Sequence, residues 1–192
     1  MTKDLMYQDE IKDAVRDAYG SITGGGGDAV AGRLYSEEEL AELPSGARDW
    51  ALGVGNPVRY AFLQPDEVVL DIGSGGGIDT ILAARRVGPR GKAIGLDVVD
   101  AMIDRAGANV AEAGVEGWTE FLLGEMEQIP LPDASVDVVI SNGVLNLSAR
   151  KSRALAEIFR VLKPGGRISI ADLTVEGELP PEIANDMSAW AG

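Results

Sequence analysis

One short stretch of this 192-residue chain is the clearest sign of its fold: Val68-Val69-Leu70-Asp71-Ile72-Gly73-Ser74-Gly75-Gly76-Gly77-Ile78. Residues 68–72 are mostly apolar and β-branched, which predicts a short buried strand. Residues 73–77 are four glycines and a serine, a composition that lets the backbone turn sharply and lets a ligand lie against bare peptide. A helical pattern follows over 78–87, so the stretch reads as a strand, a tight turn and a helix N-terminus.

The same alternation continues toward the C-terminus. Short apolar runs predict further strands at 93–96, 119–123, 136–140 and 167–175, and helical spacing predicts helices at 101–113, with Asp100 as N-cap, and at 151–162. Pro164-Gly165-Gly166 predicts the turn into the last strand. Strands that alternate with helices indicate an α/β fold, a doubly wound, mostly parallel, Rossmann-like sheet.

The first 65 residues have a different, helical character. Apolar spacing predicts a helix over 9–19 that stops at Gly20, and four consecutive glycines, 24–27, predict a mobile loop. A capping box at 36–39 opens a short helix that ends before Pro44, and Asn56-Pro57 opens another that runs to about Leu63. We therefore expect a helical N-terminal cap over 1–65, an α/β core over 66–176 and a C-terminal extension over 177–192.

Composition excludes several classes of chemistry. The chain has no cysteine and no histidine, so disulfides, Cys/His metal sites and Ser-His or Cys-His catalysis are impossible, and no metal site is expected. With 17 Lys+Arg against 31 Asp+Glu, the net charge of −14 argues against nucleic acid and anionic membranes as partners. No long apolar run exists, and the first ten residues are too charged for a signal peptide, so we expect a cytoplasmic protein.

The glycine loop and one later carboxylate suggest the ligand. A dinucleotide fingerprint fails because Ile78 occupies the position of its third glycine, and a P-loop fails because no Gly-Lys-Ser/Thr follows. Asp97 ends the next strand, where an acid can accept both hydroxyls of a ribose. The alternative for the loop is an ordinary glycine-rich turn, and the alternative for Asp97 is an aspartate that caps a helix or is solvated. Together the two features favour an adenosine ligand without a pyrophosphate.

Four motifs in order carry a family resemblance: DIGSGGG at 71–77, GLD at 95–97, LGEMEQIPLPDASVDVVISN at 123–142 and RVLKPGGRISIAD at 160–172. They resemble class I S-adenosylmethionine-dependent methyltransferases. YSEEELAELPSGARDWALGVGNP, AARRVGPRGKAIGLD, SNGVLNLS and the terminal AWAG further resemble the arsenite methyltransferase subgroup. The chain is more distantly similar to quinone C-methyltransferases.

This resemblance implies S-adenosylmethionine as cofactor and assigns roles to residues. The loop 73–77 would pack against the methionine moiety and ribose, with Asp71 orienting the loop or meeting the amino group. Asp97 would hold the ribose hydroxyls, Glu125 the adenine amino group, and Met126 would offer its N–H to the ring. Asn142 would face methionine and the acceptor, and Tyr19 would close over the sulfonium. The implied binding residues are Tyr19, Asp71, Gly73, Ser74, Gly75, Gly77, Asp97, Val98, Glu125, Met126 and Asn142.

Three of these residues have a purely structural alternative: Glu125 as a surface carboxylate, Asn142 as an Asn turn at a strand end and Tyr19 as a core tyrosine. Methyl transfer from a sulfonium needs alignment and a desolvated cavity and requires neither a metal nor a protein nucleophile. We therefore assign no catalytic residue from the sequence. The expected function is methyl transfer to a small molecule, and the alternative is a subunit that binds S-adenosylmethionine without transferring its methyl group.

Two departures from the resemblance shape the expectation. The arsenite subgroup has Gly-Cys-Gly-Asn-Pro where this chain has Gly-Val-Gly-Asn-Pro at 53–57, and Ser-Asn-Cys where it has Ser-Asn-Gly at 141–143. Trivalent arsenic needs soft thiolate ligands, so arsenite is not the expected substrate. The helix and hairpin that usually follow the fifth strand also have no counterpart. A long apolar edge would remain, which predicts that something covers it: the rest of a longer chain, a second copy in a homo-oligomer, or the partner chain of a split enzyme that supplies the missing half.

Overall fold

A computed structural model describes residues 3–21, 26–174 and 177. Its centre is a sheet of five parallel strands in the order β3-β2-β1-β4-β5. The strands are β1 (Val68–Ile72), β2 (Lys92–Asp97), β3 (Thr119–Leu123), β4 (Val136–Asn142) and β5 (Leu162–Ala171). This topology confirms the α/β, doubly wound, Rossmann-like fold.

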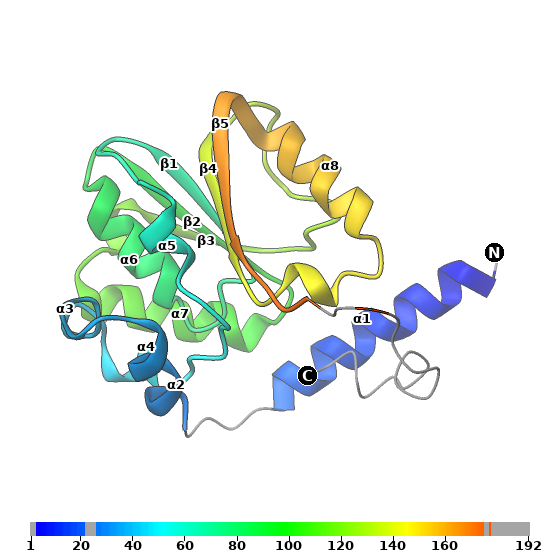
Figure 1. The fold of residues 1–192 in the computed structure, drawn as a ribbon, viewed down its shortest axis with the longest axis horizontal. Helices are drawn as coiled ribbons and strands as arrows, with labels where there is room; N and C mark the ends of the chain where they lie inside the picture. Colours follow the sequence, from blue (N-terminus) through cyan, green and yellow to red (C-terminus); the bar gives the residue numbers. More distant parts are fainter. Residues whose placement is uncertain (1–2, 22–25, 175–176, 178–192) are drawn as a thin grey trace.

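Helices cover both faces of the sheet, as Figure 1 shows. Two helices, α6 (Ile78–Val87) and α7 (Asp100–Ala113), lie on one face, and α8 (Lys151–Val161) lies on the other. Short 3₁₀ turns over Glu116–Trp118 and Leu145–Leu147 join the layers. Successive side chains of a strand therefore point to opposite faces of the sheet. Val69 belongs to the apolar cluster on the α6 side, and Leu70 belongs to the cluster on the α8 side.

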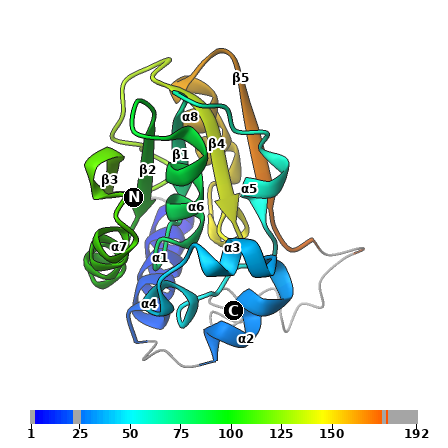
Figure 2. The same cartoon turned by 90° about the vertical axis from the view of Figure 1, so that its left-hand side faces the viewer.

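The N-terminal helices gather at the carboxyl ends of the strands (Figure 2). They are α1 (Lys3–Ser21), α2 (Gly27–Leu34), α3 (Glu37–Ala41) and α4 (Ser45–Arg48), followed by α5 (Pro57–Tyr60) beside β5. The capping box of α3 is confirmed, since Ser36 and Glu39 exchange both hydrogen bonds. The Asn56 side chain accepts from the Arg59 N–H, which confirms the cap of α5.

Several element boundaries differ from the sequence-based expectation. Gly27 begins α2 and is not part of a loop, because a side chain at this position would lie 2.3 Å from the Asp49 carbonyl oxygen and only glycine permits that approach. Residues 24 and 25 of the expected mobile loop lie outside the described residues. The helices α2 and α4 were not predicted, and α1 continues through Gly20 to Ser21.

Three further boundaries shift. The N-cap of α7 is Val99, and Asp100 is the first helical residue, because its position favours the helix dipole without a side-chain cap. α5 ends at Tyr60, three residues early, where the chain turns toward β1. β5 spans 162–171, because Leu162 already pairs with Val136 before an irregularity at the predicted Pro-Gly-Gly turn. Val175 and the C-terminal extension, except Gly177, lie outside the described residues.

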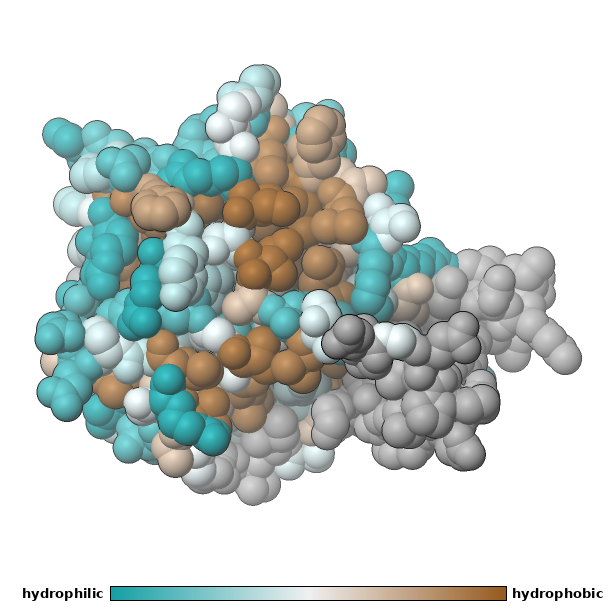
Figure 3. Space-filling model, viewed as in Figure 1, coloured by the Kyte–Doolittle hydropathy of each residue, from teal (hydrophilic) through white to brown (hydrophobic). Residues whose placement is uncertain are grey.

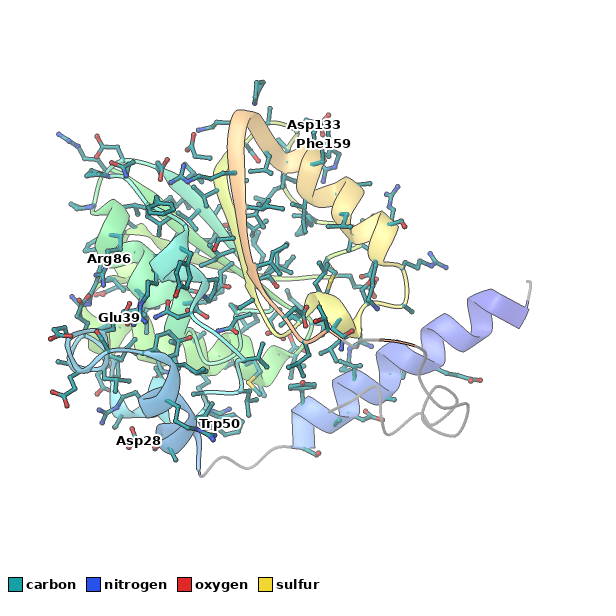
Figure 4. All side chains as sticks on the ribbon, viewed as in Figure 1. Asp28, Glu39, Trp50, Arg86, Asp133 and Phe159 are labelled. Carbon is teal, nitrogen blue, oxygen red and sulfur yellow. The ribbon has the colours of Figure 1, made fainter. Side chains whose placement is uncertain are left out.

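The edge strand β5 exposes apolar side chains. Ile168 is 50% exposed, and on α8 Phe159 is 81% and Leu155 is 45% exposed. Hydrophobic residues gather between β5 and α8 in Figure 3, and Figure 4 shows Phe159 at the outer end of α8, near Asp133. Within the described residues, no helix is both long enough and apolar enough to cross a membrane.

Candidate active site

A pocket opens at the carboxyl ends of four neighbouring strands. Parallel strands end at one edge of the sheet, so the segments that follow them converge there. Those segments supply the glycine loop after β1, Asp97 at the end of β2, Glu125 after β3 and Asn142 at the end of β4, and all of them line the pocket. Tyr19 of α1 lines it from the other side. The structure therefore brings together residues that the sequence placed in five separate segments.

The glycine loop is held in a conformation that favours glycine. Gly73, Gly75 and Gly77 have φ values of +71°, +50° and +88°. The N–H groups of Gly73 and Ser74 donate to the Leu96 carbonyl oxygen at 2.7 and 3.1 Å. A side chain at position 73 would also lie 2.3 Å from a methyl carbon of Val144. The loop is thus fastened to β2 and packed too closely for any larger residue at position 73.

Asp97 is fixed by backbone donors. Its Oδ2 accepts from the Gly75 N–H at 2.9 Å, and its Oδ1 accepts from the Val99 N–H at 3.0 Å. Burial raises the pKa of this carboxyl, and the backbone hydrogen bonds partly offset that effect. Asp97 and the neighbouring Val98 both line the pocket. A carboxylate held in this way presents acceptor oxygens at the expected position of a ribose.

Two predicted residues lie behind the pocket wall. Asp71 is only 2% exposed and accepts from the Thr80 hydroxyl at 2.6 Å, so it tethers β1 to α6. Gly77 is the N-cap of α6, and a side chain there would meet Ala106 of α7 at 3.3 Å. Neither residue is among those that line the pocket. Both shape the loop from behind, and for Asp71 this placement agrees with its expected loop-orienting role.

The far end of the pocket is formed by the segment after β3. Glu125 and Met126 line it together with Gly124, whose N–H donates to the Asp97 carbonyl oxygen at 2.9 Å. Met126 also packs on the apolar cluster beneath α8. The segment is therefore bound to the same strand end that carries Asp97, at the position expected for an adenine ring.

α1 and the loop after α4 close the opposite side. Val15, Arg16 and Tyr19 line the pocket from α1, and Trp50 lines it after α4. Burial and the nearby charge of Asp97 raise the pKa of the Tyr19 hydroxyl. The Arg105 guanidinium stacks 3.2 Å from the centre of the Trp50 ring. Of these residues the sequence indicated only Tyr19.

Asn142 is the centre of a buried polar network that the sequence did not reveal. Its Nδ2 donates to Asp79 Oδ2 at 2.9 Å, and the Tyr35 hydroxyl donates to Asp79 Oδ1 at 3.0 Å. The Asn142 Oδ1 accepts from the N–H groups of Val54 and Gly55 at 2.9 and 3.0 Å. Tyr35 and Asp79 are both 6% exposed. The only sequence signal was an acid in the first turn after the glycine loop.

Burial also changes the acidity of this network. Burial raises the pKa of Asp79 to about 6. The hydrogen bonds from Asn142 and Tyr35 stabilise the carboxylate and so limit this rise. Burial likewise raises the pKa of Asp71, and the charge of Asp79 adds to this effect. The Tyr35 hydroxyl has a raised pKa because it is buried and lies beside Asp79. Near neutral pH, Tyr35 is therefore a neutral hydroxyl donor and Asp79 is a carboxylate.

The residues present fit a cationic adenosyl sulfonium. The pocket is lined by four carboxylates, Asp79, Asp97, Glu125 and Glu127, and among Lys and Arg only by Arg16. Within the described part of the chain, the buried Ser74 hydroxyl has no hydrogen-bond partner. Since buried polar groups are normally satisfied, this hydroxyl marks one hydrogen bond of the loop that the described residues leave unmade.

Comparison with known proteins agrees with this site. The family described as Methyltransferase domain matches residues 63–192. The chain belongs to this family, the class I S-adenosylmethionine-dependent methyltransferases, and S-adenosylmethionine is its cosubstrate.

Individual relatives are similar over much of the chain. An arsenite methyltransferase of Halobacterium salinarum is 44% identical over 82% of this chain and 40% of its own length. A ubiquinone/menaquinone biosynthesis C-methyltransferase of Marinomonas sp. is 36% identical over 68% of this chain and 53% of its own length. The crystal structure of an arsenic(III) S-adenosylmethionine methyltransferase from Chlamydomonas reinhardtii has a TM-score of 0.69 at 33% identity, over 83% of this chain and 52% of that chain. The chain thus spans about half the length of these relatives.

Proposed function

We propose that this protein transfers the methyl group of S-adenosylmethionine to a small organic molecule. When bound, S-adenosylmethionine supplies an electrophilic methyl group on a sulfonium. The chain contributes a fixed glycine loop and Asp97, which would orient the adenosyl group, and walls that exclude water. The proposed location is the cytoplasm. Its reducing conditions suit a chain without disulfides, although such a chain can also exist in other compartments.

The proposal of an organic acceptor rests on the apolar residues that line the pocket beside Asn142. Leu52, Gly53, Gly143, Val144 and Leu147 line this part of the pocket, and none has a polar side chain. A side chain at position 143 would lie 3.4 Å from a methyl carbon of Val54, so positions 54 and 143 are neighbours. An apolar wall favours a hydrocarbon-rich acceptor.

The same wall argues against arsenite, although two of the relatives described above carry arsenic methylation in their names. A soft arsenic(III) centre binds thiolates, and the chain contains no cysteine at position 54, at position 143 or elsewhere. We propose that arsenite is not methylated by this chain. Turnover that depends on arsenite would contradict this statement directly.

The test uses the purified chain, S-adenosylmethionine with a labelled methyl group, and parallel reactions with quinols, catechols and arsenite. Transfer to an aromatic acceptor supports the proposal. Binding of S-adenosylmethionine by calorimetry without transfer to any acceptor would favour the alternative, a subunit that binds S-adenosylmethionine and supports a catalytic partner. The Asp97→Ala variant is the negative control, and Asp104→Asn, at an exposed position on α7, is the matched variant outside the pocket.

A further inference from the structure

Within the described residues, the backbone hydrogen bonds of the segment 53–55 are made with one side chain, that of Asn142. Val54 and Gly55 donate their N–H groups to Asn142 Oδ1, and the Gly55 carbonyl oxygen accepts from Asn142 Nδ2 at 2.8 Å. Gly53 lies directly on the same amide, since a side chain there would be 2.4 Å from Asn142 Nδ2. One amide group therefore sets the position of three consecutive residues.

The amide of Asn142 is itself oriented from behind. Its Nδ2 lies 2.9 Å from Asp79 Oδ2 and 3.1 Å from the Tyr35 hydroxyl oxygen, both of which accept from it. Because Asp79 offers only acceptors to it, Nδ2 must lie on the side of Asp79, where its two N–H groups serve Asp79, Tyr35 and the Gly55 carbonyl oxygen, and Oδ1 must face the N–H groups of Val54 and Gly55. The Tyr35 hydroxyl in turn donates to Asp79 and fixes the carboxylate.

The segment is tied at its far end by a second buried carboxylate. Asn56 Nδ2 donates to both oxygens of Glu39, at 3.2 and 3.0 Å, and Arg59 donates to Glu39 Oε2 at 2.8 Å. Glu39 is 8% exposed and belongs to the capping box of α3. The segment 53–55 is thus held between two polar anchors, one at the end of β4 and one at α3.

We propose that Tyr35, Asp79 and Asn142 are positioning residues that act as one unit to hold the segment 53–55 in place as the acceptor-side wall of the pocket. The inference rests on the proposed function, since it assigns this wall to the acceptor. Asp79 is the hub of this unit, since one of its oxygens accepts from Tyr35 and the other from Asn142. Variants at Tyr35 and Asp79 are expected to loosen this wall, and the protection of the amides in residues 53–55 is the quantity that reports it.

The experiment measures amide hydrogen exchange at residues 53–55 in the purified chain. Asp79→Ala is expected to accelerate exchange there roughly tenfold, the factor for one lost hydrogen bond of ordinary net strength, and Tyr35→Phe is expected to act similarly but more weakly. Asp79→Asn restores most of the protection, because its amide oxygen still accepts from Asn142. Asp104→Asn and the exposed Tyr60→Phe are matched controls that leave exchange unchanged.

Calorimetry with S-adenosylmethionine on the same samples separates the possible failures. If the wild-type chain does not bind S-adenosylmethionine, the proposed function fails, whatever the exchange data show. If the wild type binds it but Asp79→Ala leaves exchange at 53–55 unchanged, the positioning role is overturned. A loss of affinity beyond tenfold in both Asp79→Ala and Asp79→Asn would overturn it too, because Asp79 would then be a cofactor ligand. Exchange in β1 serves as the monitor of global unfolding.

Discussion

The N–H of Gly75 donates to Oδ2 of Asp97 at 2.9 Å, so the loop after β1 and the end of β2 are joined through the residue expected to hold the ribose. The contact links the two motifs that pointed to an adenosine ligand. It also means that the carboxylate serves two purposes, since it orders the loop and presents acceptor oxygens to the pocket. Substitutions at Asp97 are therefore expected to affect binding more strongly than stability.

Asp97→Ala is expected to weaken S-adenosylmethionine binding by roughly 100-fold, because hydrogen bonds to a charged group are each worth about 1.5–3 kcal/mol. Asp97→Asn is expected to lose less, since its amide oxygen can still accept from Gly75. Titration calorimetry measures both variants against Asp104→Asn. An affinity within threefold of the wild type in Asp97→Ala would show that Asp97 does not hold the ligand.

Gly73→Ala is expected to destabilise the protein more than Gly114→Ala. Both glycines have φ near +70°, at +71° and +69°, so each alanine incurs left-handed backbone strain of about 1–2 kcal/mol. Position 114 has open space, whereas a side chain at position 73 meets Val144 at 2.3 Å and adds overpacking of about 1–3 kcal/mol. Urea denaturation compares the two variants, and equal losses would mean that Val144 moves aside freely.

Asp79 is expected to make stability depend on pH. Its folded-state pKa of about 6 lies above the ordinary value of 3.8, so the folded protein binds more protons than the unfolded chain between these values. The contribution of this group therefore declines as pH rises from about 4 to about 6, by at most about 3 kcal/mol. The groups that face Asp79 are Tyr35, Asn142, Asp71 and Glu39.

Asp79→Asn removes this titration, so its stability relative to the wild type is expected to rise between pH 4 and pH 7. Urea denaturation of both proteins at the two pH values gives the difference, in which carboxylates far from Asp79 cancel, whereas loss of the Asp79 charge lowers the pKa of Asp71 and adds to the rise. A constant difference across this range would contradict the raised pKa. The same variant is expected to keep the positioning of residues 53–55, which separates the charge of Asp79 from its hydrogen bonds.

The edge of β5 is expected to be covered in solution by a second copy or another chain. An exposed edge strand with Ile168 and Phe159 nearby is a surface that soluble proteins normally protect. Ile168→Lys is expected to lower the mass measured by light scattering, whereas Leu123→Lys, on the opposite edge strand β3, leaves it unchanged. Leu123 is 53% exposed and so provides a matched position. A stable monomer at every concentration would contradict self-association.

Local patterns in the sequence determined the framework of this protein. The periodicity of apolar residues predicted all five strands and the helices α6, α7 and α8, because strand and core-facing helix signals are local. The glycine loop and Asp97 were also visible, since a positive φ and a carboxylate at a strand end depend on residue type and short-range position. These residues by themselves indicated an adenosine ligand, and the resemblance of four motifs to class I methyltransferases indicated S-adenosylmethionine.

Only the tertiary structure decided how the acceptor side is built. Tyr35 lies 44 positions from Asp79 and 107 from Asn142, and no local pattern connects three such residues. The glycine run predicts a loop at Gly27, because the sequence cannot show that the Asp49 carbonyl oxygen approaches this residue. The chain folds these distant residues onto one edge of a parallel sheet, where burial turns isolated polar side chains into a connected network. Long-range packing alone therefore determined the pocket wall beside Asn142.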